Sequence, residues 1–127
     1  MTRAELVALV ERYFAAVDAE DFTALRAILA AECVFSVETH GVRLEGIEAI
    51  EAMFRGLWSD HAAVRHHNFV HVPDPRENRI ASRFLVINTH HDGRLVHKSN
   101  CNFFEASRER FDRVAVYMAG ENTLDKD

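Results

Sequence analysis

The stretch IASRFLVINTHHDGRLVHKSNCNFFE, residues Ile80–Glu105, contains two runs typical of β-strands joined by a turn. β-Branched and aromatic residues are frequent in both Ile80–Thr89 and Leu95–Glu105, as expected for strands with a buried face. Asp92 and Gly93 lie between the runs, and this dipeptide is a strong hairpin signal. The pattern therefore predicts an antiparallel pair, around which the rest of a sheet can assemble.

Segments on both sides of this pair extend the predicted sheet. Val64–Val72 is a third strand-like run, separated from the pair by the breaker Pro73–Pro75, and Phe111–Met118 is a fourth. Short connections favour antiparallel pairing of neighbouring strands, which gives a meander. Earlier in the chain, Cys33–Thr39 and Val42–Glu45 predict a shorter hairpin.

Three amphipathic helices complete the predicted fold. Apolar residues recur every three or four positions within segments 6–17, 22–29 and 47–58, the spacing of helices with one buried face. Thr2 and Glu5 form a capping box before the first helix, and Asp21 can cap the second. We predict one α+β domain over residues 1–127, with the order ααββαββββ. Its curved, mostly antiparallel sheet is expected to pack on three helices around an apolar pocket.

Composition excludes several classes of function. The formal net charge is -5, so no excess of Lys and Arg is present to bind nucleic acid or an anionic membrane. No apolar segment has the form of a secretory signal or a membrane span. Cys33 and Cys101 lie within apolar runs, which suits reduced, buried thiols and predicts a cytoplasmic location.

Two segments and the order of elements resemble the nuclear transport factor 2-like superfamily. The segments are Glu11–Phe22, with the sequence ERYFAAVDAEDF, and Val116–Asn122, with the sequence VYMAGEN. Within the superfamily the chain looks most like SnoaL-like proteins and ketosteroid isomerases. The resemblance covers nearly the whole chain and implies a cone-shaped fold that holds a small apolar organic ligand. One fold can host many activities, and those implied here include isomerases, dehydratases and cyclases.

The resemblance to the isomerases assigns two hydrogen-bond donors. Tyr13 falls where those enzymes have an oxyanion-binding tyrosine on the first helix. Asn102 falls at the strand position of a neutral aspartic acid that donates the second hydrogen bond. The general base of the family, an aspartate, aligns with Val37, so the isomerase mechanism lacks its base in this chain.

The resemblance to dehydratase-like members assigns a histidine instead. Those proteins use a histidine on the strand after the third helix, and the run Arg65–Asn68 resembles that segment. His66 is therefore a candidate general acid or base, since the ordinary pKa of histidine lies near neutrality. The carboxylate that partners this histidine has no expected counterpart, because the corresponding part of the first helix offers Phe14 and Ala15.

Alternation along the strands predicts which residues share a face of the sheet. On the strand Val64–Val72, one face is predicted to point into the pocket. It carries Val64, His66, Asn68, Val70 and Val72. The predicted convex face carries His67, Phe69, His71, Phe84, Val86, Cys101 and Phe103. Because the convex face would be partly apolar, we predict that it meets a second copy of the chain in a homodimer.

Further side chains are predicted to line the pocket, which should combine an apolar wall with a few polar groups. They are Phe14, Val17, Val37, Phe54, Trp58, Asn68, Asn100, Val116 and Met118. No metal or cofactor is predicted: His90 and His91 are adjacent on a strand and would point to opposite faces.

Two functions remain open from the sequence. The first is a cofactor-free isomerase or lyase, of dehydratase or cyclase type, that acts on an apolar carbonyl compound through Tyr13, His66 and Asn102. The second is a non-catalytic dimeric protein that binds a ligand or serves as an accessory subunit. The missing base at Val37 motivates the second hypothesis.

Overall fold

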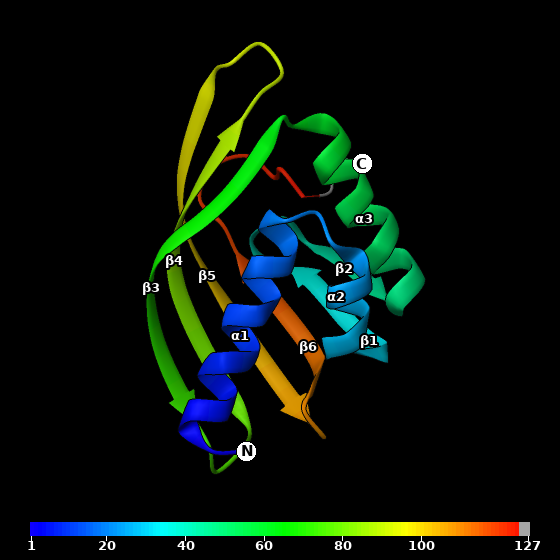
Figure 1. The fold of residues 1–127 in the computed structure, drawn as a ribbon, viewed down its shortest axis with the longest axis vertical. Coiled ribbons are helices and arrows are strands. Elements are labelled where there is room, and N and C mark those ends of the chain that lie inside the picture. The colour runs from blue at the N-terminus through cyan, green and yellow to red at the C-terminus, as the bar shows by residue number, and fades with distance from the viewer. Residues whose placement is uncertain (125–127) are drawn as a thin grey trace.

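A six-stranded sheet curls around the helices in the computed structural model, which describes residues 1–124 (Figure 1). The elements follow one another in the predicted order, with one additional short 3-10 helix, η1. The helices are α1 (Arg3–Asp18), α2 (Phe22–Ile28), η1 (Glu38–His40) and α3 (Ile47–Asp60). The strands are β1 (Leu29–Val37), β2 (Val42–Glu45), β3 (Ala63–Asp74), β4 (Arg79–Thr89), β5 (Leu95–Ser107) and β6 (Arg110–Tyr117).

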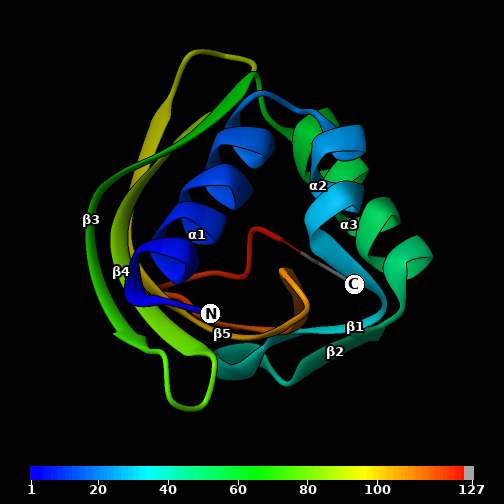
Figure 2. The same cartoon turned by 60° about the horizontal axis from the view of Figure 1, so that its bottom comes forward.

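The strand order in the sheet is β2-β1-β6-β5-β4-β3. Strands β3 to β6 form the predicted antiparallel meander. Strand β1 pairs with β2 antiparallel and with β6 parallel, which joins the two halves of the chain into one sheet. The long meander strands bend strongly, as Figure 2 shows for β3, β4 and β5.

Helix α1 lies inside the curve of β3 and β4 (Figure 2). It begins with the predicted capping box, in which Thr2 accepts a hydrogen bond from the Glu5 backbone N–H and the Glu5 side chain accepts one from Thr2. Its buried stripe includes Leu6, Val10 and Tyr13, so the apolar face of the helix fills the centre of the cone. None of the helices within residues 1–124 is long and apolar enough to cross a membrane.

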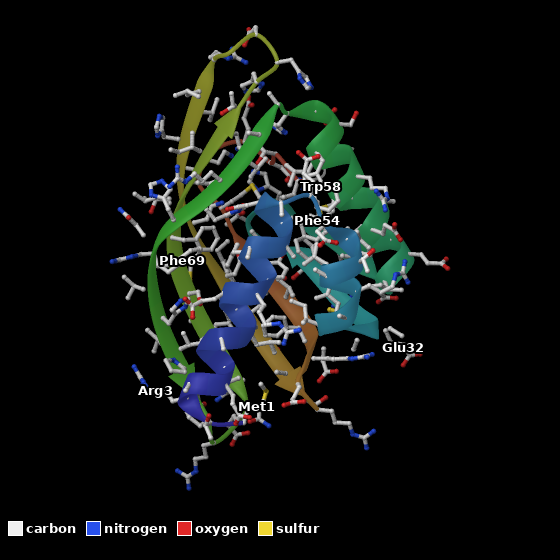
Figure 3. The ribbon with its side chains drawn as sticks, in the orientation of Figure 1. Met1, Arg3, Glu32, Phe54, Trp58 and Phe69 are labelled. Atoms are coloured by element: carbon white, nitrogen blue, oxygen red, sulfur yellow. The ribbon has the colours of Figure 1, made fainter. Side chains whose placement is uncertain are left out.

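Helix α3 closes the other side of the cone. Phe54 and Trp58 point from it into the interior (Figure 3), where their rings stack with centroids 5.7 Å apart. The Trp58 indole N–H donates to the Val17 carbonyl oxygen at 3.0 Å. This bond ties α3 to the last turn of α1.

A β-bulge at Asn68 changes the register of β3. His66 pairs with Val86, but the pairing shifts before it resumes at Val70. Asn68 has a φ of 57°, a left-handed conformation that asparagine adopts more readily than most residues. The bulge reverses the alternation of side chains beyond it.

The prediction of which β3 side chains face the pocket is therefore wrong for the residues after the bulge. Phe69 points inward toward α1 (Figure 3), with its ring centroid 5.0 Å from that of Phe14, and His71 contacts the buried Ser82. Val70 and Val72, expected in the pocket, are instead exposed.

Two residues of β4 also lie on the opposite face from the one predicted. Phe84 and Val86 are buried on the concave side rather than the convex side. Directly paired residues share a face of the sheet, and Phe84 pairs with Asn100, whereas Cys101 pairs with Arg83. The alternation on β5 therefore puts Cys101 and Phe103 on the convex face, as predicted.

Candidate functional site

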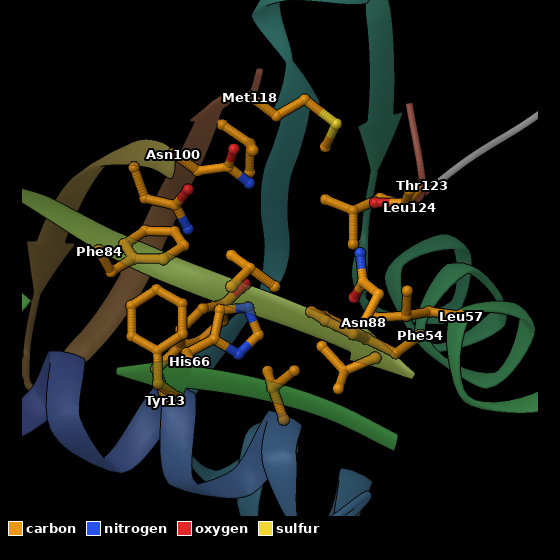
Figure 4. A pocket seen from close by; sticks show the side chains of 16 residues that line it. Tyr13, Phe54, Leu57, His66, Phe84, Asn88, Asn100, Met118, Thr123 and Leu124 are labelled. Atoms are coloured by element: carbon orange, nitrogen blue, oxygen red, sulfur yellow. The ribbon is translucent and has the colours of Figure 1, made fainter. Parts of the chain in front are cut away.

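A narrow pocket lies on the concave side of the sheet, between α1, α3 and the meander (Figure 4). The three residues predicted to be catalytic, Tyr13, His66 and Asn102, all line it. So do six of the residues predicted as its wall: Phe14, Val17, Phe54, Asn100, Val116 and Met118. The pocket therefore brings together the three residues proposed to be catalytic and most of the predicted wall.

Three other residues predicted as wall do not line this pocket. Val37 is fully buried in the core beneath it. Trp58 packs on Phe54, and its indole N–H donates a hydrogen bond to the backbone of α1. Asn68 is exposed because the bulge turns it away from the concave face. Other side chains line the pocket without having been predicted to do so: Leu57, Phe84, Val86, Asn88, Thr123 and Leu124.

His66 is paired with a carboxylate. The Asp18 Oδ1 atom lies 2.5 Å from the His66 Nδ1 atom, and Asp18 Oδ2 accepts the His66 backbone N–H at 2.9 Å. A carboxylate at Nδ1 favours the tautomer with its proton on that nitrogen, which leaves Nε2 free to accept a proton. The two hydrogen bonds also hold the ring in one orientation.

The carboxylate comes from Asp18, the last residue of α1. The resemblance placed it one turn earlier, near Phe14 and Ala15, and so predicted no partner for His66. Residues four apart lie on the same face of a helix, so Asp18 follows Phe14 on the face that meets β3. This spacing was the signal that could have identified the partner of His66. The bond between Trp58 and Val17 fixes the turn that carries Asp18.

Aromatic rings enclose the imidazole of His66. Its ring centroid lies 4.8 Å from that of Phe14 and 5.4 Å from that of Phe84. The His66 side chain is only 10% exposed. Limited access of water strengthens the interaction between the imidazole and the Asp18 carboxylate, because the local dielectric constant is low.

Tyr13 provides a hydroxyl group on the same wall. Its ring packs edge-on against several phenylalanines, with centroids 4.9 Å from Phe14 and 5.3 Å from Phe104. Burial raises the pKa of Tyr13 well above its usual value, so the hydroxyl stays protonated. Within residues 1–124 this hydroxyl has no hydrogen-bond partner. It is therefore available to donate to a ligand.

Three asparagines supply amides to the pocket. Asn100 Oδ1 accepts a hydrogen bond from the Ala119 backbone N–H at 3.0 Å. Asn102 and Asn88 are almost completely buried, at 3% and 1% exposed, and have unpartnered atoms, Oδ1 in Asn102 and Nδ2 in Asn88, among the residues described. An unpaired buried amide costs free energy, and a ligand oxygen or hydroxyl could restore the missing bonds.

The segment after β6 crosses the mouth of the pocket. The Lys98 ammonium group donates to the Ala119 carbonyl oxygen at 2.8 Å and also to the Glu121 carbonyl oxygen. Burial lowers the pKa of Lys98. Beyond these anchors, Thr123 and Leu124 contribute to the lining of the pocket (Figure 4), so the segment narrows the space left for a ligand.

The histidines at the tip of the β4–β5 hairpin make local contacts instead. His90 lies with its ring centroid 5.3 Å from that of His61. His91 donates from Nε2 to the Ser59 carbonyl oxygen at 2.8 Å. Across residues 1–124, His, Cys, Asp and Glu side chains form no group of three that could hold a metal ion.

Comparison with solved structures shows the same fold in other proteins. A candidate polyketide cyclase from Xanthomonas campestris pv. campestris aligns with a TM-score of 0.83 and 19% identity, over 91% of this chain and 90% of that chain. A candidate polyketide cyclase from Pseudomonas putida aligns with a TM-score of 0.78 and 22% identity, over 86% of this chain and 87% of that chain. PrhC from Penicillium brasilianum has a TM-score of 0.83 and 16% identity, over 94% and 83%.

A search of curated proteins finds no match. In contrast, the family model of the SnoaL-like domain matches residues 1–120 of this chain, which is nearly its whole length. Together with the α+β cone and its six-stranded sheet, this match confirms the predicted resemblance. The chain belongs to the SnoaL-like domain family, and its fold is the one seen in a nuclear transport factor 2-like protein from Exiguobacterium.

Proposed function

We propose that this protein is a cofactor-free lyase or isomerase that moves a proton next to the carbonyl group of a small apolar compound. The observation that carries the proposal is the Asp18–His66 pair, in which a carboxylate holds an imidazole against an apolar pocket. Such a pair is the usual arrangement for a general base that works near neutral pH. The names of the structural neighbours, candidate polyketide cyclases, agree with carbonyl chemistry.

The proposed reaction starts with proton abstraction. His66 Nε2 takes a proton from the carbon beside the carbonyl, and the electron pair of that C–H bond moves to form an enolate. The Tyr13 hydroxyl donates a hydrogen bond to the enolate oxygen, and Asn102, which also lines the pocket, orients the substrate. The imidazolium, stabilised by Asp18, then returns the proton to another carbon or to a departing oxygen, so that His66 is regenerated.

The alternative, a non-catalytic binding protein, needs only the apolar pocket. It gives no role to a carboxylate that makes two hydrogen bonds to one histidine. The pocket itself supports a small apolar organic ligand under either function.

The cysteines Cys33 and Cys101 are both free, which supports the proposed cytoplasmic location.

Proton exchange tests the proposal without knowledge of the natural substrate. Neutral ketones such as 1-tetralone are incubated with the protein in deuterium oxide, and deuterium uptake beside the carbonyl is followed by NMR. His66→Gln should slow the exchange by about 100-fold or more, the usual contribution of a general base. Asp18→Asn should slow it by about tenfold or more, since it leaves the imidazole in the wrong tautomer.

Two further variants complete the experiment. Tyr13→Phe should slow exchange by about 100-fold, the typical cost of losing one donor to a developing oxyanion. His97→Gln, an exposed change on β5 outside the pocket, is the matched control and should exchange like the wild type. The proposed base is wrong if His66→Gln and Asp18→Asn exchange deuterium into a ketone as fast as the wild type does.

A further inference from the structure

The pocket has a second polar end, away from Tyr13. Figure 4 shows Tyr13, His66 and Phe84 on one side, and Asn88 on the other, beside Leu57 and the segment that carries Thr123 and Leu124. Apolar side chains separate the two ends. A ligand that fills the pocket therefore meets polar groups at two places rather than one.

The pairing of β3 with β4 places Asn88 relative to His66. His66 is paired with Val86, and Val64 with Asn88, and all four residues line the pocket. Asn88 is thus the diagonal cross-strand neighbour of His66. The backbones of such neighbours lie about 7–8 Å apart, so one small ligand can contact both side chains.

The amide of Asn88 is an unusual group for this position. Asn88 is 1% exposed, and its side-chain nitrogen, Nδ2, is buried. The amide makes no hydrogen bond within residues 1–124. A purely structural amide at such a site would be bonded to the protein, since more than nine in ten buried polar groups are. An apolar residue would fill the space at lower cost.

We infer that Asn88 is a specificity-determining residue that binds a second oxygen of the substrate. The substrate class is a small, neutral, largely apolar ring compound with two oxygen functions. One is the carbonyl beside His66, and the other is a hydroxyl or carbonyl at another position of the ring that bonds to Asn88. The inference rests on the proposed use of this pocket and adds the chemistry that selects its ligand.

Binding of matched ketones tests the inference without any turnover. Hydroxytetralones in their neutral form, with the hydroxyl at the 5, 6 or 7 position, are compared with the methyltetralones of the same substitution. Dissociation constants are measured by NMR titration of the full chain. The wild type should bind at least one hydroxyl compound about fivefold more tightly than its methyl counterpart, the effect of one net hydrogen bond.

Asn88→Leu should abolish that preference and leave the binding of the methyl compound unchanged or tighter. Asn88→Ala is a second variant that should show the same loss of preference, and Ser99→Ala, exposed on β5 outside the pocket, is the control that should keep it. The inference fails if no hydroxyl compound is preferred, if the preference survives in both Asn88 variants, or if no ketone binds the wild type. Loss of proton exchange in the His66 variants with an intact preference would separate this result from that of the proposed reaction.

Discussion

Two groups of polar side chains at the pocket differ in what they contact. Asp18 and His66 satisfy each other across the space between α1 and β3. Asn88 and Asn102, in contrast, keep unpartnered atoms in a pocket within the described chain. The first group orients a reactive nitrogen, and the second is costly unless a ligand supplies the missing bonds. Both kinds are expected where binding, rather than stability, selects the residue.

His71 belongs to neither group and gives the fold a pH dependence. Its Nδ1 atom forms a hydrogen bond with the buried Ser82 hydroxyl, at 2.8 Å. Burial lowers the pKa of His71, and the charge of Glu11 opposes this only in part. Because the folded state holds its proton less tightly than the unfolded state, the free energy of unfolding should fall as the pH drops through the ordinary pKa of histidine.

Urea denaturation at about pH 7.5 and about pH 5.5 measures this effect. His71→Gln keeps a hydrogen-bonding side chain beside Ser82 but cannot titrate, so its free energy of unfolding should fall less than that of the wild type between the two pH values. Equal losses in the two proteins would show that His71 does not couple protonation to folding.

At the scale of the element, the bulge in β3 sets which residues face the pocket. Asn68 occupies the left-handed region, where a β-branched residue costs about 1–2 kcal/mol. Asn68→Val should lower the free energy of unfolding by about that amount, whereas Asn68→Gly should change it little because glycine accepts this conformation. Urea denaturation compares the two with Ser99→Val, a control on the exposed face of the regular strand β5. A loss from Ser99→Val as large as that from Asn68→Val would show that the backbone conformation is not the cause.

The elements themselves could be predicted from periodicity and turn chemistry, because the apolar stripes of α1 and α3 and the Asp92-Gly93 turn are local signals. The direction of side chains beyond Asn68 could not. A bulge inserts one residue and reverses the alternation of all that follow, and nothing in the run from Arg65 to Asn68 distinguishes it from a regular strand.

The candidate site divides in the same way. Tyr13 and Asn102 were placed by resemblance, and both line the pocket. Asp18 could not be predicted by resemblance, because it lies one turn beyond the position at which related proteins carry the carboxylate. The crossing of the pocket by Leu124 was missed because it depends on the Lys98 ammonium group binding backbone carbonyls far along the chain, and such a contact leaves no pattern in the sequence.

At the scale of the whole molecule, the convex face of the sheet remains apolar after the corrections to the register. The large exposed apolar side chains on it are Val70, Val72, Leu85, Phe103 and Tyr117, from four neighbouring strands. Val72 is 65% exposed and Tyr117 45%, and a face that exposes several large apolar side chains is a candidate interface. We therefore keep the prediction that two copies of the chain pair through this face.

Sedimentation velocity at micromolar concentration should show a dimer of the full chain. Phe103→Glu and Val72→Glu should each shift it toward the monomer, since a carboxylate placed in the centre of an interface must be desolvated without a partner. Ala52→Glu adds the same charge on the exposed side of α3 and should leave the dimer intact. A wild type that sediments as a strict monomer would exclude the pairing, and dissociation by Ala52→Glu to the same extent would assign the effect to net charge rather than to the convex face.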